Sequence, residues 1–414
     1  MPPSGSPGRP SESADLRWLD LLKAVALCWI FLNHLAEQLF GYPYFGNPRA
    51  GWPSLGERIK QLAPLAGLGE WAIPANLLRY VGWCGDQGVQ LFLIASGFGL
   101  TWGLLRRQAA AKLELGDFYS RRANRVFPLW WTAHLFFFFT WLVAGWGMSV
   151  AKPASYLSFF GLRITLKSFY YFAPAWWFIG LLLQLYLVYP ILWKLLRKKG
   201  PLWLLTAGSS VALLIRGVGL LVLERHLDFW SRGGVFVTRL PEFLFGMCLA
   251  AWYFSDPLRV QRTLKGPQSV LGGVVFYLVG IFLSFSLIGM TLAPALVGVG
   301  AFLLLYPALA WLGGRAGAGG GVWIGRHSYS LFLMHHPFLL LLVAPAYGWA
   351  AVNVLRATAL AIVLCVATAL VLEWVAALAT RLVTWSFLEE KLAWLCTACV
   401  MLGLVGGGAL IWAE

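Results

Sequence analysis

Two ionisable residues in the first long apolar stretch, Lys23 and His34, have types and a spacing that could carry chemistry. They are eleven residues apart, which on a helix is three turns plus about 20°, so both project from one face with roughly 16 Å between them along the axis. An ionisable side chain within an apolar span is costly and therefore points to function. The imidazole could take a proton from an attacking hydroxyl, or it could be a buried residue that only satisfies a hydrogen bond.

This layout, with a cation at one end and a base at the other, suits an acyl-CoA thioester. Such a donor has phosphates at one end and a reactive carbonyl at the far end of an uncharged arm. Lys23 would then meet the phosphates, and His34 would act at the carbonyl. Glu37 follows His34 by three residues and could orient the imidazole. It could equally be a solvated residue at the end of the span.

A second candidate group lies in the segment 118–128, which contains Arg122 and Arg125. Residues at i and i+3 share a helix face, so both guanidinium groups could grip one phosphate through paired donors. The alternative is that they only anchor a cytoplasmic loop, since such loops retain positive charge. Ser96 precedes Gly97 in an apolar stretch, and its hydroxyl could help to bind the donor. The alternative is that Ser96 and Gly97 serve only helix packing, because glycine allows close approach of two helices.

Other polar residues in apolar stretches carry weaker signals. His335 and His336 are adjacent, so on a helix they point about 100° apart and would make a poor joint chelate. Cys396 and Cys399 form a C-x-x-C in an apolar segment without the βαβ context of a redox motif. We therefore predict no metal site and no disulfide framework.

Five further ionisable residues in these stretches could simply satisfy one another inside a bundle. They are His134, Glu242 and Glu373, with Arg216 and Arg239 as possible partners.

The composition decides which elements position these residues. Of 414 residues, 59% are hydrophobic and only 12% are charged, whereas a soluble domain has about 25% charged residues. A membrane-spanning helix needs about 20 mostly apolar residues, and such stretches fill the chain. The fold class predicted is therefore all-α, a polytopic transmembrane helical bundle of about 10–11 spans. The spans are expected near residues 17–40, 80–105, 126–147, 172–196, 202–222, 236–254, 269–289, 291–312, 326–346, 350–378 and 392–412.

Charge gives the orientation. The net charge of +15 comes without a dense basic stripe or a recognition motif, so we expect no nucleic-acid partner. Most of the 32 Lys and Arg residues fall on the cytoplasmic side if the N-terminus is cytoplasmic, so we predict this orientation.

The chain is expected to divide into a short tail and one membrane domain. Residues 1–16 are rich in Ser, Pro and Gly and are expected to form a disordered cytoplasmic tail. Residues 17–414 are expected to form one membrane domain. The outer segments 41–79 and 148–171 could shape an acceptor site.

Six segments, in this order, resemble the acyltransferase 3 family of membrane-bound acyltransferases, and the resemblance covers nearly the whole chain. They are Leu19–Ala26 with Lys23 and His34, Gly88–Phe98 with Ser96, Phe118–Pro128 with Arg122-x-x-Arg125, Trp177–Pro190, Arg239–Met247 and Gly325–Pro337.

The resemblance implies roles for these residues. His34 would be the catalytic base, and Lys23, Arg122 and Arg125 would engage acyl-CoA from the cytoplasm. The chain departs from the family pattern at Leu182 and Leu183, where many relatives carry an acidic residue, and at Gln90, where Asp is common.

The predicted function is transfer of an acyl group, with acetyl-CoA as the expected donor, to a hydroxyl of a carbohydrate or lipid-linked glycan. The enzyme would be an O-acetyltransferase in the bacterial inner (cytoplasmic) membrane, in contact with membrane lipid. The alternative is a transporter or flippase for an envelope precursor, with the same intramembrane charges lining a passage.

Overall fold

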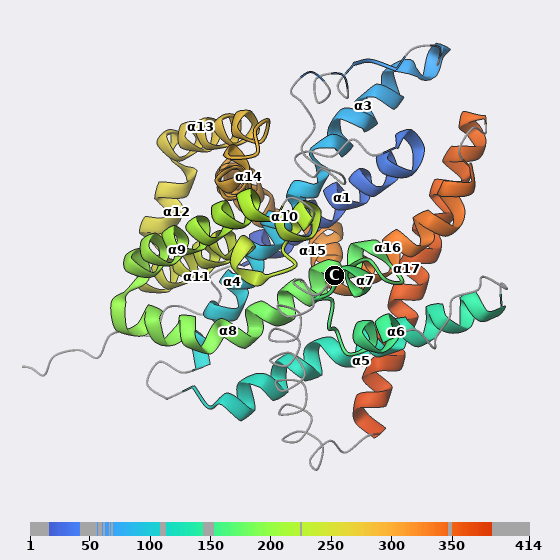
Figure 1. The fold of residues 1–414 in the computed structure, drawn as a ribbon. Coiled ribbons are helices and arrows are strands. Elements are labelled where there is room, and N and C mark those ends of the chain that lie inside the picture. The colour runs from blue at the N-terminus through green and yellow to red at the C-terminus, as the bar shows by residue number, and fades with distance from the viewer. Residues whose placement is uncertain are drawn as a thin grey trace, which may run out of the picture.

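The computed structural model describes residues 16–41, 69–107, 113–143, 153–223, 226–346 and 350–382, together with single positions between 56 and 67. All regular elements in these ranges are helices, and they pack as one bundle (Figure 1). Seven helical segments are long and apolar enough to cross a membrane. They are α1 (Arg17–Phe40), the run Gly69–Arg107, α5 (Leu115–Val143), the run Pro174–Lys199, α9 (Pro201–Val222), α14 (Ala293–Gly313) and α17 (Ala351–Leu382).

The remaining expected spans account for the difference from eleven. The helices α12 (Pro257–Lys265) and α13 (Pro267–Leu283) meet at a bend of 62° and count as an eighth span if taken together. The expected spans 236–254 and 326–346 contain helices that are shorter than predicted, α11 (Leu240–Ser255) and α16 (Ser328–Phe338). The expected span 392–412 and the tail up to residue 15 lie outside the described residues.

Two of these spans are runs of more than one helix. The run Gly69–Arg107 contains α3 (Ala72–Trp83) and α4 (Gly88–Arg107), and α8 (Trp177–Lys199) forms most of the run Pro174–Lys199. Shorter helices connect the spans. Among them are α6 (Pro153–Phe159), α7 (Leu166–Phe169), α10 (Leu227–Arg232) and α15 (Gly319–Arg326).

Helix α5 begins earlier than the sequence predicts, at Leu115 instead of residue 126. The apolar pattern starts only at 126, so the polar first turns resemble a loop. An ion pair between Asp117 and Arg121, at i and i+4, supports the helix in this polar stretch. The early start places Arg122 and Arg125 on a helix, which their proposed joint action requires.

Helices α4 and α11 approach each other closely, because glycines face the partner backbone on both sides. A Cβ added at Gly97 would lie 2.2 Å from the carbonyl oxygen of Phe243, and one at Gly246 would lie 2.1 Å from that of Ile94. Any larger residue at either position would push the helices apart. The packing role expected of Gly97 is therefore confirmed.

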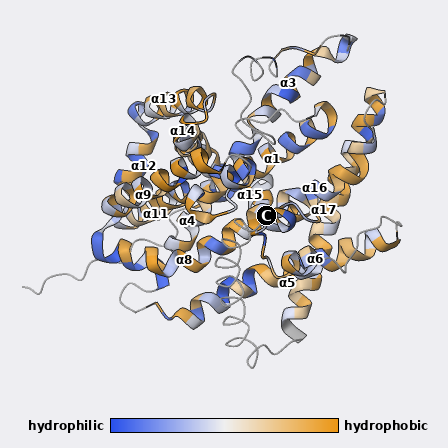
Figure 2. Cartoon of the chain, viewed as in Figure 1, coloured by the Kyte–Doolittle hydropathy of each residue, from blue (hydrophilic) through white to orange (hydrophobic). Residues whose placement is uncertain are grey.

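The outer helices carry large apolar side chains on exposed surface, as the hydrophobic colouring along α13 and α17 shows (Figure 2). Leu214 of α9, Phe282 of α13 and Trp374 of α17 are 69%, 75% and 67% exposed. Water-soluble monomers rarely expose apolar surface on this scale. Together with the seven long apolar helices, this surface identifies an integral membrane protein.

One carboxylate of helix α17, that of Glu373, hydrogen-bonds to residues at the start of α16. Glu373 accepts a hydrogen bond from the Ser330 hydroxyl at 2.6 Å, and its other oxygen lies 2.7 Å from Nδ1 of His327. These contacts join α17 to the start of α16. They explain Glu373 as a structural residue, with His327 as its partner instead of either arginine considered for it.

Candidate active site

A cavity of about 140 Å³ brings together three of the residues expected to bind the donor. Lys23 reaches it from α1, Ser96 from α4 and Arg125 from α5. The Lys23 ammonium is also paired with Asp20 at 2.6 Å. Three helices that are distant along the chain therefore place two cations and a hydroxyl around one space.

Arg122 is half-buried next to this cavity. Its charge interacts with those of Arg125, Arg121 and Arg107 and with the hydroxyl of Tyr186. Its Nε is buried and has no hydrogen-bond partner among the described residues. Like charges gathered without a carboxylate among the groups acting on Arg122 favour binding of an anion, and phosphate suits the guanidinium fork.

The remaining cavity wall is mostly aromatic and uncharged. Tyr186 and Tyr329 both line it, and Tyr329 donates a hydrogen bond to the carbonyl oxygen of Val126 at 3.0 Å. Leu182 also lines it. The chain thus has an apolar side chain in the wall at a position where the resemblance expects an acid, which removes a negative charge from the surroundings of the two cations.

His34 lies on the same side of α1 as Lys23, and both face α16. Lys23 shares the cavity with Ser328 at the start of α16, and the His34 ring lies 4.3 Å from that of His336 near its end. Their spacing predicted this common face. Nδ1 of His34 lies 2.9 Å from a carboxylate oxygen of Glu37. Glu37 is buried, so its interpretation as a solvated residue is wrong.

Two further histidines from α16 surround His34. The rings of His335 and His336 lie 5.4 Å and 4.3 Å from the ring of His34. Nδ1 of His335 donates to the carbonyl oxygen of Phe332 at 2.7 Å, whereas neither ring nitrogen of His336 has a hydrogen-bond partner among the described residues. The sequence indicated no link between these residues and His34.

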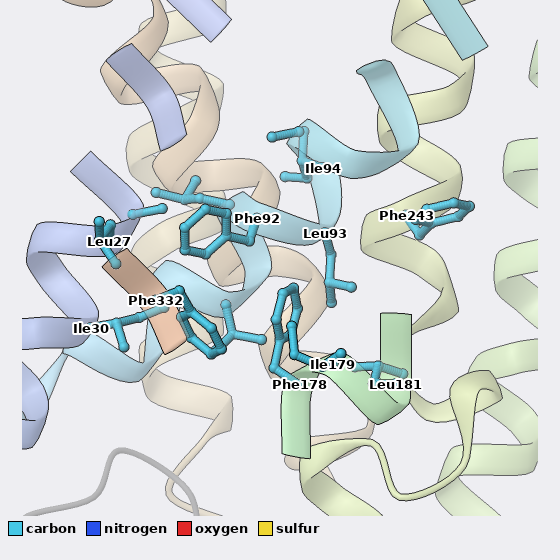
Figure 3. Close-up of a cluster of buried hydrophobic side chains, with 14 of the residues drawn as sticks. Leu27, Ile30, Phe92, Leu93, Ile94, Phe178, Ile179, Leu181, Phe243 and Phe332 are labelled. Atoms are coloured by element: carbon cyan, nitrogen blue, oxygen red, sulfur yellow. The ribbon is translucent and has the colours of Figure 1, made fainter. Parts of the chain in front are cut away.

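His34 does not line the 140 Å³ cavity. The cavity wall includes Phe92, Phe178 and Phe332, which come together from α4, α8 and α16 (Figure 3). Their rings lie 5.6–6.2 Å apart. The Phe332 ring is also 5.3 Å from His335, which contacts His34. Phe332 therefore borders both the 140 Å³ cavity and the histidine cluster.

A larger cavity, of about 350 Å³, lies beside His134. Its lining residues are mainly aromatic, and none carries a charged side chain. Both nitrogens of His134 are occupied, Nδ1 by the carbonyl oxygen of Trp130 at 2.9 Å and Nε2 by the hydroxyl of Ser158 at 3.0 Å. This cavity cannot hold the phosphates of a donor, although it is the larger one.

Of the buried arginines expected to pair with buried polar residues, one lies beside a carboxylate and the other donates hydrogen bonds to backbone carbonyl oxygens. Arg239 lies 3.5 Å from Glu242, whereas Arg216 donates to the carbonyl oxygens of Met290 at 2.9 Å and Thr238 at 2.5 Å. With its amide turned to satisfy both atoms, Gln90 accepts from Arg239 at 3.3 Å. The departure at Gln90 thus belongs to this buried network and not to the wall of the 140 Å³ cavity.

Residues 16–378 match the family model of acyltransferase 3, described as an acyltransferase domain. The match covers nearly the whole chain, including all residues of the 140 Å³ cavity and of the histidine cluster. No curated protein and no solved structure matches the chain significantly.

Proposed function

Because the chain belongs to the acyltransferase 3 family, we propose that it transfers an acyl group from acyl-CoA to a hydroxyl of a carbohydrate or envelope glycan, with His34 as general base. The observation that carries this proposal is the convergence of Lys23, Ser96 and Arg125 on one cavity. The alternative function, a transporter or flippase for an envelope precursor, is disfavoured because the chain belongs to a family of acyltransferases.

The donor's phosphates would bind at the cationic end. Arg122 and Arg125 supply paired N–H donors, and Lys23 adds a point charge that it shares with Asp20. Ser96 would hydrogen-bond the arm of the donor where it enters the bundle. The absence of an acid at Leu182 avoids repulsion of the phosphates.

The chemistry would take place at His34. Glu37 holds Nδ1 of the imidazole, which leaves Nε2 to remove the proton from the acceptor hydroxyl. The hydroxyl oxygen then forms a bond to the thioester carbon, the carbon–sulfur bond breaks, and the imidazolium returns the proton to the departing thiolate. Between these two proton transfers, the carboxylate of Glu37 stabilises the imidazolium.

The aromatic cluster favours a short acyl group. For the thioester to pass from the cavity to His34, the ring of Phe332 would have to move aside, because it lines the cavity and also contacts His335. A cavity of about 140 Å³ leaves little room for a long chain. We therefore propose acetyl-CoA as the donor and O-acetylation as the reaction.

We also propose how the protein is oriented in the membrane. The donor cavity lies toward the first turns of α1, so a cytoplasmic N-terminus lets acyl-CoA enter from the cytoplasm of a bacterial cell. The acceptor then approaches from the other side of the inner membrane. Reporter fusions within residues 106–125 test this topology, and a signal from outside the cytoplasm would contradict donor entry from within.

Turnover can be measured on the whole protein in lipid nanodiscs with radiolabelled acetyl-CoA. We expect release of CoA and transfer of label to glycan acceptors by the wild type, and neither by His34→Gln. Wild-type protein that moves a glycan precursor across vesicles without consuming acyl-CoA would overturn the proposal in favour of a transporter.

A further inference from the structure

His34, Glu37 and His336 bring two imidazoles and a carboxylate together from two helices. One ligand atom from each lies within 4.8 Å of the other two. Zn²⁺ binds nitrogen and oxygen at about 2.0–2.2 Å in a tetrahedron, which holds neighbouring ligand atoms about 3.3 Å apart. Side-chain rotations that change the separation of two ligand atoms by up to about 1.5 Å close this difference. We propose that these three residues form a binding site for a Zn²⁺-like divalent cation.

The state of His336 points independently to a ligand. This side chain is only 1% exposed, and neither of its ring nitrogens has a hydrogen-bond partner among the described residues. Buried polar atoms in native proteins are almost always satisfied. A cation held against the His34 ring, 4.3 Å away, would satisfy one of these nitrogens by direct coordination.

The ligand set selects the type of cation. Two imidazoles and one carboxylate suit Zn²⁺ and its neighbours, whereas Mg²⁺ and Ca²⁺ prefer oxygen ligands. His34 and Glu37 are one helical turn apart on α1, and two of their possible ligand atoms, Nδ1 and Oε2, are already 2.9 Å apart. His336 completes the set from α16. Three protein ligands leave one coordination position open, as in zinc sites that also bind water or substrate.

The sequence predicted no metal site because His336 stands beside His335, and two adjacent histidines on a helix make a poor joint chelate. In the fold, His336 joins residues from the first helix instead. His335 stays outside the ligating group, and its Nδ1 is held by the carbonyl oxygen of Phe332 at 2.7 Å. It therefore serves as a matched control, since it has the same chemistry and a similar burial beside the same His34 ring.

Cation binding has one consequence for turnover, and this consequence alone rests on the proposed function. A neutral imidazole that coordinates Zn²⁺ through one nitrogen carries its proton on the other, so His34 would then have no free nitrogen to accept a proton. The ion would then inhibit acyl transfer reversibly, with relief by a chelator. Binding itself does not depend on whether the protein is an acyltransferase.

The experiment uses the full chain in nanodiscs after removal of metals by a chelator. Titration with Zn²⁺ is followed by calorimetry, and titration with Co²⁺ by its visible absorption. We expect one ion per chain, and at least about tenfold weaker binding in His336→Ala and Glu37→Gln. His335→Ala should bind within about threefold of wild type. Zn²⁺ should raise the unfolding temperature of wild type and of His335→Ala but not that of His336→Ala.

A second replacement, His336→Phe, retains the ring volume and guards against a loss of fold in the alanine variant. No binding by the folded wild type, or unchanged binding by both folded His336 variants, would overturn the cation site. Binding to wild type without any acyl transfer would leave the cation site standing and contradict the proposed function. Transfer that continues at saturating bound Zn²⁺ would contradict His34 as the general base and would leave the cation site standing.

Discussion

The surroundings of His34 and of His134 differ in how completely hydrogen bonds engage the histidine ring nitrogens. Each histidine lies past the middle of a long helix and among aromatic neighbours. His134 has both ring nitrogens engaged, by Trp130 and Ser158. His34 has one nitrogen against Glu37 and faces His336, which lacks any hydrogen-bond partner among the described residues.

The arginines of the two regions differ in how far hydrogen bonds engage them. Arg163, beside His134, is fully buried and donates to Ser158 at 2.7 Å, to the carbonyl oxygen of Tyr171 at 2.6 Å and to that of Phe169 at 2.9 Å. Nε is buried without a hydrogen-bond partner among the described residues in both arginines, but Arg122 is surrounded by the like charges of three other arginines. A polar cluster that satisfies itself supports the fold, whereas one left incomplete is available to a ligand.

The largest effect should separate the two histidines directly. His34→Ala should lower turnover by about 10²–10⁴-fold, the usual contribution of a general base, with the fold and donor binding retained. Turnover measured at saturating acetyl-CoA, alongside the unfolding temperature, checks this. A variant with nearly full turnover would reduce His34 to a packing residue like His134.

The arginine pair should give the next largest effect. Arg122→Ala combined with Arg125→Ala should weaken acyl-CoA binding by about 10–100-fold, since hydrogen bonds to charged groups contribute about 1.5–3 kcal/mol each. The difference from wild type should shrink as salt rises, because salt screens exposed phosphate contacts. Donor titrations at low and high salt measure both quantities. Equal affinities at low salt would make the pair topology anchors only.

His134→Ala should act on stability instead of on turnover. Loss of this imidazole removes its hydrogen bonds to the Ser158 hydroxyl and to the Trp130 carbonyl oxygen, so we expect the free energy of unfolding to fall by about 1–3 kcal/mol. Denaturant or thermal unfolding in detergent measures this change. A loss of turnover as large as that of His34→Ala, in a variant of normal stability, would break the comparison.

The smallest effect is expected at Lys23. Its ammonium is partly exposed and already paired with Asp20, and exposed ion pairs contribute about 0–1 kcal/mol. Lys23→Ala should therefore raise KM for acyl-CoA by about two- to fivefold while kcat at saturating donor changes less. Steady-state kinetics decide this, and a fall in kcat with constant KM would place Lys23 near the reacting carbonyl.

The sequence by itself determined the features that depend on local spacing and composition. The apolar stretches predicted the membrane bundle, and the interval of eleven residues predicted that Lys23 and His34 share a face. The interval of three predicted the same for Arg122 and Arg125, and Gly97 indicated close packing. These inferences succeed because helix geometry and hydrophobic burial follow from neighbouring residues alone.

The tertiary structure alone decided which distant residues meet. The burial of Glu37, the position of Phe332 in the wall of the 140 Å³ cavity, and the contact of His336 with His34 all depend on how other helices pack against α1. Contacts between helices far apart in the chain leave no periodic signal in either segment. The physical reason is that such contacts are selected by the packing of whole helices, to which every side chain along the interface contributes.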